Sequence, residues 1–285
     1  LRLFQGLGTM TLWVTGSTIA GQLGPAAERG RWLGAFNQVG AFSSLAGDIV
    51  GGYLLYAHGF TLTYVVLSAI TIAGFLLVLA FMRREPAGRD DSDATNRERL
   101  RQLVDRPPLR AMLVFRALFS MGKMIVLIFL PIYARTSFGV NALAIGGILA
   151  GGKLTKSLSQ GWMGRFTDRI GGRERFVVVG ARVYAAGAAA IPFADSVRGA
   201  VDPLFIAVLG QTATITGPMA VLFLTFGLAG VGDSIRLPAS MALFVEEGAQ
   251  SQSAASSLSL RSLSWKLGEL SGAHLAGVIT DAVSA

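Results

Sequence analysis

The 285-residue sequence contains no cysteine and only two histidines, His58 and His274. Without cysteine the chain forms neither a disulfide nor a thiolate metal site, and two histidines are too few for a histidine metal cluster. Charged residues are scarce as well, because Asp, Glu, Lys and Arg make up 15% of the chain, whereas a soluble domain averages roughly 25%. We therefore expect no metal, no cofactor and no ordinary soluble fold.

Hydrophobic residues make up 52% of the sequence, and 36 residues are glycine. The apolar residues gather in stretches of about 20, the length that crosses a bilayer as a helix, and glycine lets such helices approach closely. The composition predicts an all-α, multi-pass membrane protein. The eight predicted spans are 3–24, 32–56, 61–82, 111–134, 141–162, 176–194, 219–245 and 255–280.

The basic residues lie mostly in every second connection between the spans. The connections 25–31, 83–110 and 163–175 carry most of the arginines, with eight in 83–110 alone. Basic connections face the cytoplasm, so we expect a cell-membrane protein with a cytoplasmic linker at 83–110. The net charge of +8 then sets topology, and no nucleic-acid partner is expected.

Two connections fit this pattern less simply. The connection at Glu246–Gly248 should be cytoplasmic by parity, yet it carries acids in place of arginines. Residues 195–218 contain an apolar core, Leu204 to Leu209, that is too short to span. This stretch is interpreted as an external loop, with or without a segment lying in the membrane interface.

The segment Gly164 to Arg173 stands out between two apolar spans. It contains the pattern Gly-x-x-x-Asp-Arg-x-Gly followed by Arg, with Asp168, Arg169 and Gly171 at the defined positions. This pattern resembles the signature loop of the major facilitator superfamily of secondary transporters.

Two further motifs occur in the order that this family has. Arg2 to Gly8, with Gln5, resembles the motif of its fourth transmembrane helix. The stretch Gly47-Asp48-Ile-Val-Gly51-Gly52 resembles its antiporter motif, a helix-packing motif, although Asp48 stands where that motif has proline.

The resemblance implies two helical bundles related by pseudo-two-fold symmetry, of which this chain holds roughly helices four to eleven. Residues 1–82 are then the second half of the amino-terminal bundle, 83–110 the linker, and 111–285 most of the carboxy-terminal bundle. The resemblance also implies a monomer in the lipid bilayer with a small-molecule substrate.

In this family the signature loop is a gating motif. By resemblance, Asp168 accepts hydrogen bonds from the helix that begins near Trp32, Gly164 allows close approach, and Arg169 and Arg173 hold Asp168. The alternative is that the segment, with Gly171, only sets topology and makes a tight turn.

Ionisable residues within spans are costly and are therefore candidates for function. Asp233 with Arg236, and Lys266 with Glu269, are three residues apart and can pair along a helix. For Arg116, Lys156 and Arg182 the competing interpretation is that the side chains snorkel to an interface. The coupling or substrate candidates are Arg2, Gln5, Asp48, Lys123, Lys153, Asp233, Arg236, Lys266 and Glu269.

The chain is therefore expected to belong to a transporter that works by alternating access. The spans hold nine cations and three carboxylates, which suits an anionic substrate; Asp48, Asp233 and Glu269 are the candidates for proton coupling. Organic-anion transport and drug or metabolite efflux, by an antiporter for example, both stay open. The alternatives are a non-transporting membrane protein and a membrane-embedded enzyme, but no cluster of catalytic residues is found near an interface.

Overall fold

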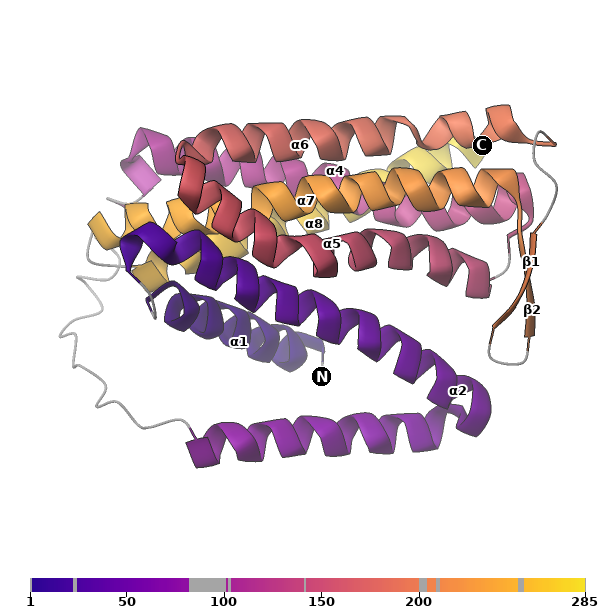
Figure 1. Ribbon diagram of the computed structural model, residues 1–285, viewed down its shortest axis with the longest axis horizontal. Helices are drawn as coiled ribbons and strands as arrows, with labels where there is room; N and C mark the ends of the chain where they lie inside the picture. The colour runs from indigo at the N-terminus through magenta and orange to yellow at the C-terminus, as the bar shows by residue number, and fades with distance from the viewer. Residues whose placement is uncertain are drawn as a thin grey trace.

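The computed structural model describes residues 2–22, 25–81, 101, 104–140, 142–199, 204–208, 211–250 and 254–284. Long helices run roughly side by side through most of it (Figure 1). The helices are α1 (Arg2–Gln22), α2 (Arg29–Phe81), α4 (Pro107–Phe138), α5 (Ala142–Ile170), α6 (Arg173–Ala189), α7 (Gly217–Gln250) and α8 (Ala254–Ser284), with short 3-10 helices η1 (Ala26–Glu28) and η2 (Ile191–Val197).

Over the described residues, each of the eight predicted spans coincides with a helix, although the span 176–194 runs past the end of α6 into η2. The second and third both belong to α2, which is interrupted at Gly59, where φ is 73° and ψ is −176°. This left-handed φ favours glycine over residues that carry a Cβ. The chain therefore reverses direction at Gly59, and the two halves of α2 form an arm that Figure 1 shows folded back on itself. The all-α polytopic fold is confirmed by the helix content and by the family match reported below.

The signature segment is helical, although it was predicted to be a loop. α5 continues to Ile170, so Asp168 lies in its last turn. The charged side chains do not end the helix, because residues at a membrane interface can remain helical while their heads reach polar surroundings. The helix ends at Gly171 and Gly172, which have φ of 73° and 64° and connect α5 to α6 in two residues.

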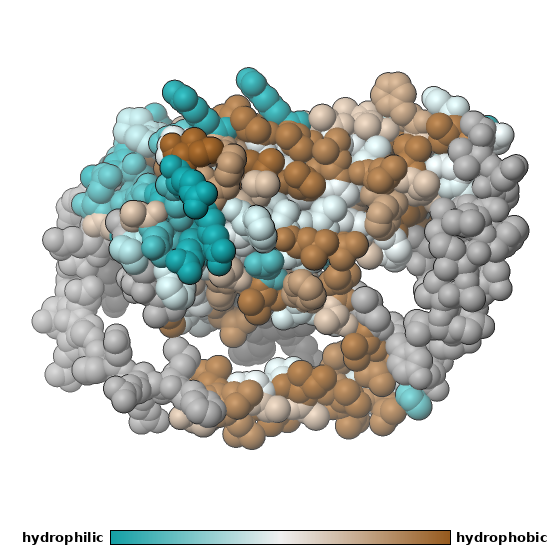
Figure 2. Space-filling model, in the orientation of Figure 1, coloured by the Kyte–Doolittle hydropathy of each residue, from teal (hydrophilic) through white to brown (hydrophobic). Residues whose placement is uncertain are grey.

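Four helices in the described part of the chain are long and apolar enough to cross a membrane. They are His58–Ala80, Pro107–Phe138, Arg173–Val197 and Gly217–Gln250. Apolar residues also cover much of the surface seen in Figure 2, and hydrophilic ones gather near the connection between α5 and α6. An apolar exterior of this kind is stable in lipid, where helices satisfy their own backbone hydrogen bonds.

Helix α7 is the centre of the packing, with α5, α6 and α8 against it. One apolar cluster surrounds its last turns and includes Leu33, Leu109 and Phe244. A second cluster surrounds its first turns and includes Leu130 and Leu222. The polar residues in the middle of α7 therefore lie between two apolar cores.

Residues 195–218 contain a small antiparallel hairpin in addition to the end of η2. Strand β1 (Leu204–Val208) pairs with β2 (Gln211–Ile215), and Leu204 is opposite Ile215. Within the apolar core that was too short to span, Leu204–Val208 therefore form a strand. In the part of the chain described here, this hairpin is the departure from an otherwise helical fold.

Candidate functional site

The last turn of α5 contacts the first turn of α2. The carboxylate of Asp168 accepts hydrogen bonds from the backbone N–H groups of Gly30, at 3.0 Å, and Arg31, at 2.7 Å. The first N–H groups of a helix have no partner within it, and they carry the positive end of the helix dipole. Asp168 therefore caps a helix that lies 137 residues earlier in the chain.

Glycines on both helices allow this approach. A Cβ on Gly34 would lie 2.9 Å from the backbone oxygen of Gln160 and 3.2 Å from Cα of Gly164. A Cβ on Gly164 would overlap the backbone carbonyl of Gly30. We call this set, Gly30, Arg31, Gly34, Gly164 and Asp168, the α2–α5 contact.

Arg173 joins the α2–α5 contact to α7. Its Nη2 lies 2.8 Å from Oδ1 of Asp168, and its Nη1 pairs with Glu246. Nearby, Arg106 pairs with Glu247 at 3.2 Å. The two acids that did not fit the charge pattern of the connections are thus the partners of Arg173, at the start of α6, and Arg106, just before α4.

The predicted gating residues are only partly brought together. Gly164, Asp168 and Arg173 meet, and Gly171 forms the turn beside them. Arg169 is exposed, and among the described contacts Asp168 is bound by Gly30, Arg31 and Arg173. That these residues act as a gate stays a prediction.

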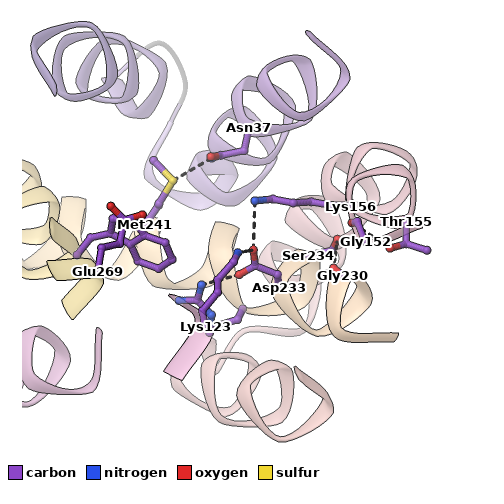
Figure 3. A network of polar contacts seen from close by, with 12 residues as sticks. Asn37, Lys123, Gly152, Thr155, Lys156, Gly230, Asp233, Ser234, Met241 and Glu269 are labelled. Atoms are coloured by element: carbon purple, nitrogen blue, oxygen red, sulfur yellow. Dashed lines mark hydrogen bonds and ion pairs between the residues drawn. The ribbon is translucent and has the colours of Figure 1, made fainter. Parts of the chain in front are cut away.

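A second polar group lies in the middle of α7. Oδ2 of Asp233 is 2.8 Å from Nζ of Lys123 on α4 and 3.2 Å from Nζ of Lys156 on α5. Its Oδ1 is 2.6 Å from Nη2 of Arg236. Figure 3 shows the two lysines reaching Asp233 from different helices. We call these four residues, Lys123, Lys156, Asp233 and Arg236, the charge cluster.

Aromatic rings surround the cations. The guanidinium of Arg236 lies 3.9 Å from the ring centre of Phe119, and that of Arg116 lies 4.5 Å from the ring centre of Trp265. Nζ of Lys123 is 5.5 Å from the same tryptophan ring. Ring faces attract cations, more strongly where water is excluded. The rings thus offset part of the cost of holding positive charge between the helices.

Positive charge exceeds negative charge in this region. Arg116 and Arg261 are buried beside the charge cluster, and Nε of Arg116 donates to the backbone oxygen of Arg261. Buried nitrogens on both, and on Arg236, have no hydrogen-bond partner among the described residues. Uncompensated buried charge is costly.

Lys156 was the residue most clearly misjudged from the sequence. The snorkelling interpretation is wrong for it, because its ammonium pairs with Asp233 inside the protein. Its position half-way along α5 was the available signal, since a lysine there is far from either interface. Arg116 was recognised as a charge within a span but not as a neighbour of the site, and Arg261, in the predicted span 255–280, was not singled out as a candidate. The sequence did contain a signal for Lys156, Arg116 and Arg261, because each lies within a predicted span and not in a connection.

Other candidates lie elsewhere. Lys266 and Glu269 pair at 2.6 Å, with Lys266 exposed, and Glu269 also accepts a hydrogen bond from the Trp265 indole. Lys153 is half-buried, one turn before Lys156 on α5. The side chains of Arg2, Gln5 and Asp48 lie outside the described residues.

The close helix packing predicted at the antiporter-like motif is not found in the described part of the chain. A Cβ on Gly47 or Gly51 would meet no atom within 4 Å, and the surroundings of Gly52 lie outside the described residues. The helix packs closely earlier, at Gly30 and Gly34, because α2 meets α5 along its first turns and then diverges from it (Figure 1).

Comparison with known proteins adds evidence that does not depend on this geometry. A family model described as Major Facilitator Superfamily matches residues 1–224. The chain is also 27% identical, over 179 residues, to the "Uncharacterized MFS-type transporter YuxJ" of Bacillus subtilis (strain 168). That alignment covers 61% of this chain and 45% of the relative, so the chain spans less than half of the relative's length. Both matches are to transporters rather than enzymes.

Proposed function

Because the chain belongs to the major facilitator superfamily, we propose that the whole protein is a secondary transporter that moves a small solute by alternating access. The main support for this proposal is the pair of hydrogen bonds that the carboxylate of Asp168, on α5, accepts from the first turn of α2. It joins a helix that precedes the linker to one that follows it. Such a contact must break when two bundles rock against each other.

The proposal includes an orientation and a gate. The linker and the α2–α5 contact face the cytoplasm, as the arginine-rich connections favour. Residues 1–82 and 111–285 belong to two bundles. The hydrogen bonds of Asp168 and its ion pair with Arg173 then hold the cytoplasmic side closed while the solute site opens outward.

The solute carries an anionic group. The support is the charge cluster, in which one carboxylate, Asp233, is shared by Lys123, Lys156 and Arg236. Arg116 and Arg261 add two more buried cations. A carboxylate or phosphate on the solute would satisfy donors that otherwise lack partners.

Protons are the proposed coupling ion, and Asp233 is the residue that takes them up. Its two oxygens contact all three cations of the charge cluster, so an anionic group that binds the lysines frees Asp233 to take up a proton. Glu269 and Asp48 are the other candidates among the carboxylates of the spans, and Arg2 remains a candidate from its motif.

The test is solute uptake by the whole protein in proteoliposomes, with and without an imposed pH gradient. Labelled organic anions and lipophilic cations are offered to the same preparation. Uptake of an anion that follows the pH gradient supports the proposal. Uptake of lipophilic cations alone would favour drug efflux and defeat the anionic assignment, and absence of any gradient-driven uptake would defeat proton coupling.

A further inference from the structure

A cavity of about 250 Å³ lies between α2 and α5, beside the α2–α5 contact. Arg31, Trp32 and Gln38 line it from α2, and Trp162 and Arg165 line it from α5. Its walls thus combine two cations with two large aromatic rings. Neither the charge cluster nor the contacts of Asp168 involve the side chains of these residues.

The cavity is short of negative charge. Among the described residues that line it there is no carboxylate. Arg31 is about half exposed and pairs at 3.1 Å with Glu28, which is itself exposed. Arg165 is exposed and takes part in none of the hydrogen bonds or ion pairs found among the described residues. The cavity therefore attracts an anionic group.

The position of the cavity indicates where that group comes from. Arg31 is two residues from the start of α2, and Arg165 is five residues from the end of α5. In the proposed orientation, helix ends on this side are expected at the level of the lipid headgroups. Trp162 is 76% exposed and Trp32 is 38% exposed. Tryptophan rings with a polar edge favour this interfacial layer.

We infer that this cavity binds the phosphate headgroup of an anionic phospholipid, with Arg31 and Arg165 on the phosphate and Trp32 and Trp162 along the glycerol and upper acyl chain. The inference rests on the proposed function for the orientation that turns this face toward the cytoplasmic leaflet, where anionic lipids are enriched. The shared chemistry is a phosphate, and the exposed tryptophans favour a lipid over free phosphate as its source.

A lipid bound there bridges the two helices that meet at the α2–α5 contact. Gln38, deeper in the cavity, already donates a hydrogen bond to the backbone oxygen of Ser157 at 2.8 Å. A phosphate between Arg31 and Arg165 adds a second bridge nearer the membrane surface. The lipid thus stabilises the closed arrangement of this side of the protein without occupying the charge cluster.

The experiment measures quenching of Trp32 and Trp162 by brominated lipids. The whole protein, with phenylalanine in place of its other tryptophans, is reconstituted into phosphatidylcholine vesicles. Brominated phosphatidylglycerol or brominated phosphatidylcholine is then titrated in. We expect the anionic lipid to quench at several-fold lower mole fraction, since each arginine near an anionic surface contributes a factor of about five.

The matched variants lose equal charge. Arg31→Gln with Arg165→Gln should abolish the preference for the anionic lipid. Arg110→Gln with Arg175→Gln removes two exposed arginines that do not line the cavity and should preserve it. Equal quenching by both lipids, or a preference that survives Arg31→Gln with Arg165→Gln, overturns the inference.

Two further arms identify the source and guard against misfolding. Inorganic phosphate or glycerol phosphate at millimolar concentration should not relieve the quenching, and relief would assign the cavity to a free phosphate. Native mass spectrometry of the protein with all its tryptophans should show retained phosphatidylglycerol, and its loss in Arg31→Gln with Arg165→Gln. Neither arm measures transport, so the lipid site and the proposed function can fail separately.

Discussion

Lys156 on α5 and Lys123 on α4 contact the same oxygen atom, Oδ2 of Asp233, at 3.2 and 2.8 Å. Asp233 is therefore the residue through which three helices meet. Its other oxygen is held by Arg236, one turn farther along α7. Any event that neutralises or occupies Asp233 changes the forces between all three helices at once.

The first prediction concerns stability. Asp233→Asn leaves buried Arg236 and partly buried Lys123 and Lys156 without their shared carboxylate, and removing one partner of a buried ion pair such as Asp233 with Arg236 costs about 3–5 kcal/mol. Adding Lys156→Gln to Asp233→Asn removes part of the excess charge and should recover part of the loss. Thermal unfolding in detergent of the unchanged protein, Asp233→Asn, Lys156→Gln and the double variant measures the coupling between the two residues.

The exposed pair provides the control for this cycle. Lys266→Gln breaks the pair with Glu269, and exposed pairs contribute only about 0–1 kcal/mol. Its unfolding temperature should stay close to that of the unchanged protein. An Asp233→Asn protein as stable as Lys266→Gln would show that the charge cluster is not buried as described.

The second prediction separates binding from coupling. Asp233→Asn retains the lysines but has no carboxylate to protonate, so exchange of labelled for unlabelled solute should continue while accumulation driven by a pH gradient is lost. Lys123→Gln should impair both, because it removes a cation that the anionic group needs. Proteoliposome counterflow and uptake assays give the two readouts. Gradient-driven accumulation by Asp233→Asn would assign proton uptake to another residue.

The third prediction tests the α2–α5 contact. Asp168→Asn loses the charge-assisted hydrogen bonds to the α2 N-terminus, each worth about 1.5–3 kcal/mol, together with the ion pair to Arg173. The closed-to-open ratio should fall by roughly tenfold or more. Reactivity of single cysteines placed on the linker side should rise accordingly.

Asp195→Asn is the control for that experiment. Asp195 is exposed on η2, at the opposite end of α6, and pairs only with its neighbour Arg198 among the described residues. It should leave cysteine reactivity unchanged. Equal reactivity in Asp168→Asn and Asp195→Asn would remove the gating role from Asp168.

The fourth prediction compares two glycines of α5. A Cβ at position 164 would lie 2.9 Å from the carbonyl carbon of Gly30, and overpacking of this kind costs about 1–3 kcal/mol. A Cβ at Gly146 would meet nothing within 4 Å, and alanine in an open helix position is favoured by up to about 1 kcal/mol. Gly164→Ala should therefore lower the unfolding temperature, while Gly146→Ala should maintain or raise it. The reverse order would contradict the close approach of α2 and α5.

Much of the architecture was predictable because a helix that crosses a membrane requires a run of about 20 mostly apolar residues, which is visible in the sequence. Each of the eight predicted spans coincides with a helix over most of its described residues, and the break at Gly59 separates two of them. Helix ends were predicted less well. Charged residues were taken to end α5, whereas Gly171 and Gly172 end it eight residues later.

The partners of charged residues were less predictable than their positions. Pairs three residues apart, such as Asp233 with Arg236, follow from helix geometry. Lys123 and Lys156 meet Asp233 across 110 and 77 residues, and no local pattern encodes that. Gly47 and Gly51 illustrate the same limit. Their spacing identifies a helix-packing motif in the sequence, but the sequence does not identify a helix that would pack against it, and no described atom lies within 4 Å of a Cβ placed at either glycine.

The fifth prediction tests the orientation of the protein in the membrane. The proposed gate and the proposed lipid site both require the α2–α5 contact to face the cytoplasm. The chain has no cysteine, so single cysteines can report on each side of one helix. Arg175 lies in the first turn of α6 and Ser196 on η2 beyond its other end, and both are exposed. The helix between them is long and apolar enough to separate the two faces of a membrane. In intact cells, a membrane-impermeant maleimide should therefore label Ser196→Cys, and label Arg175→Cys only after the membrane is opened. Labelling of Arg175→Cys in intact cells would invert the topology and place the α2–α5 contact outside.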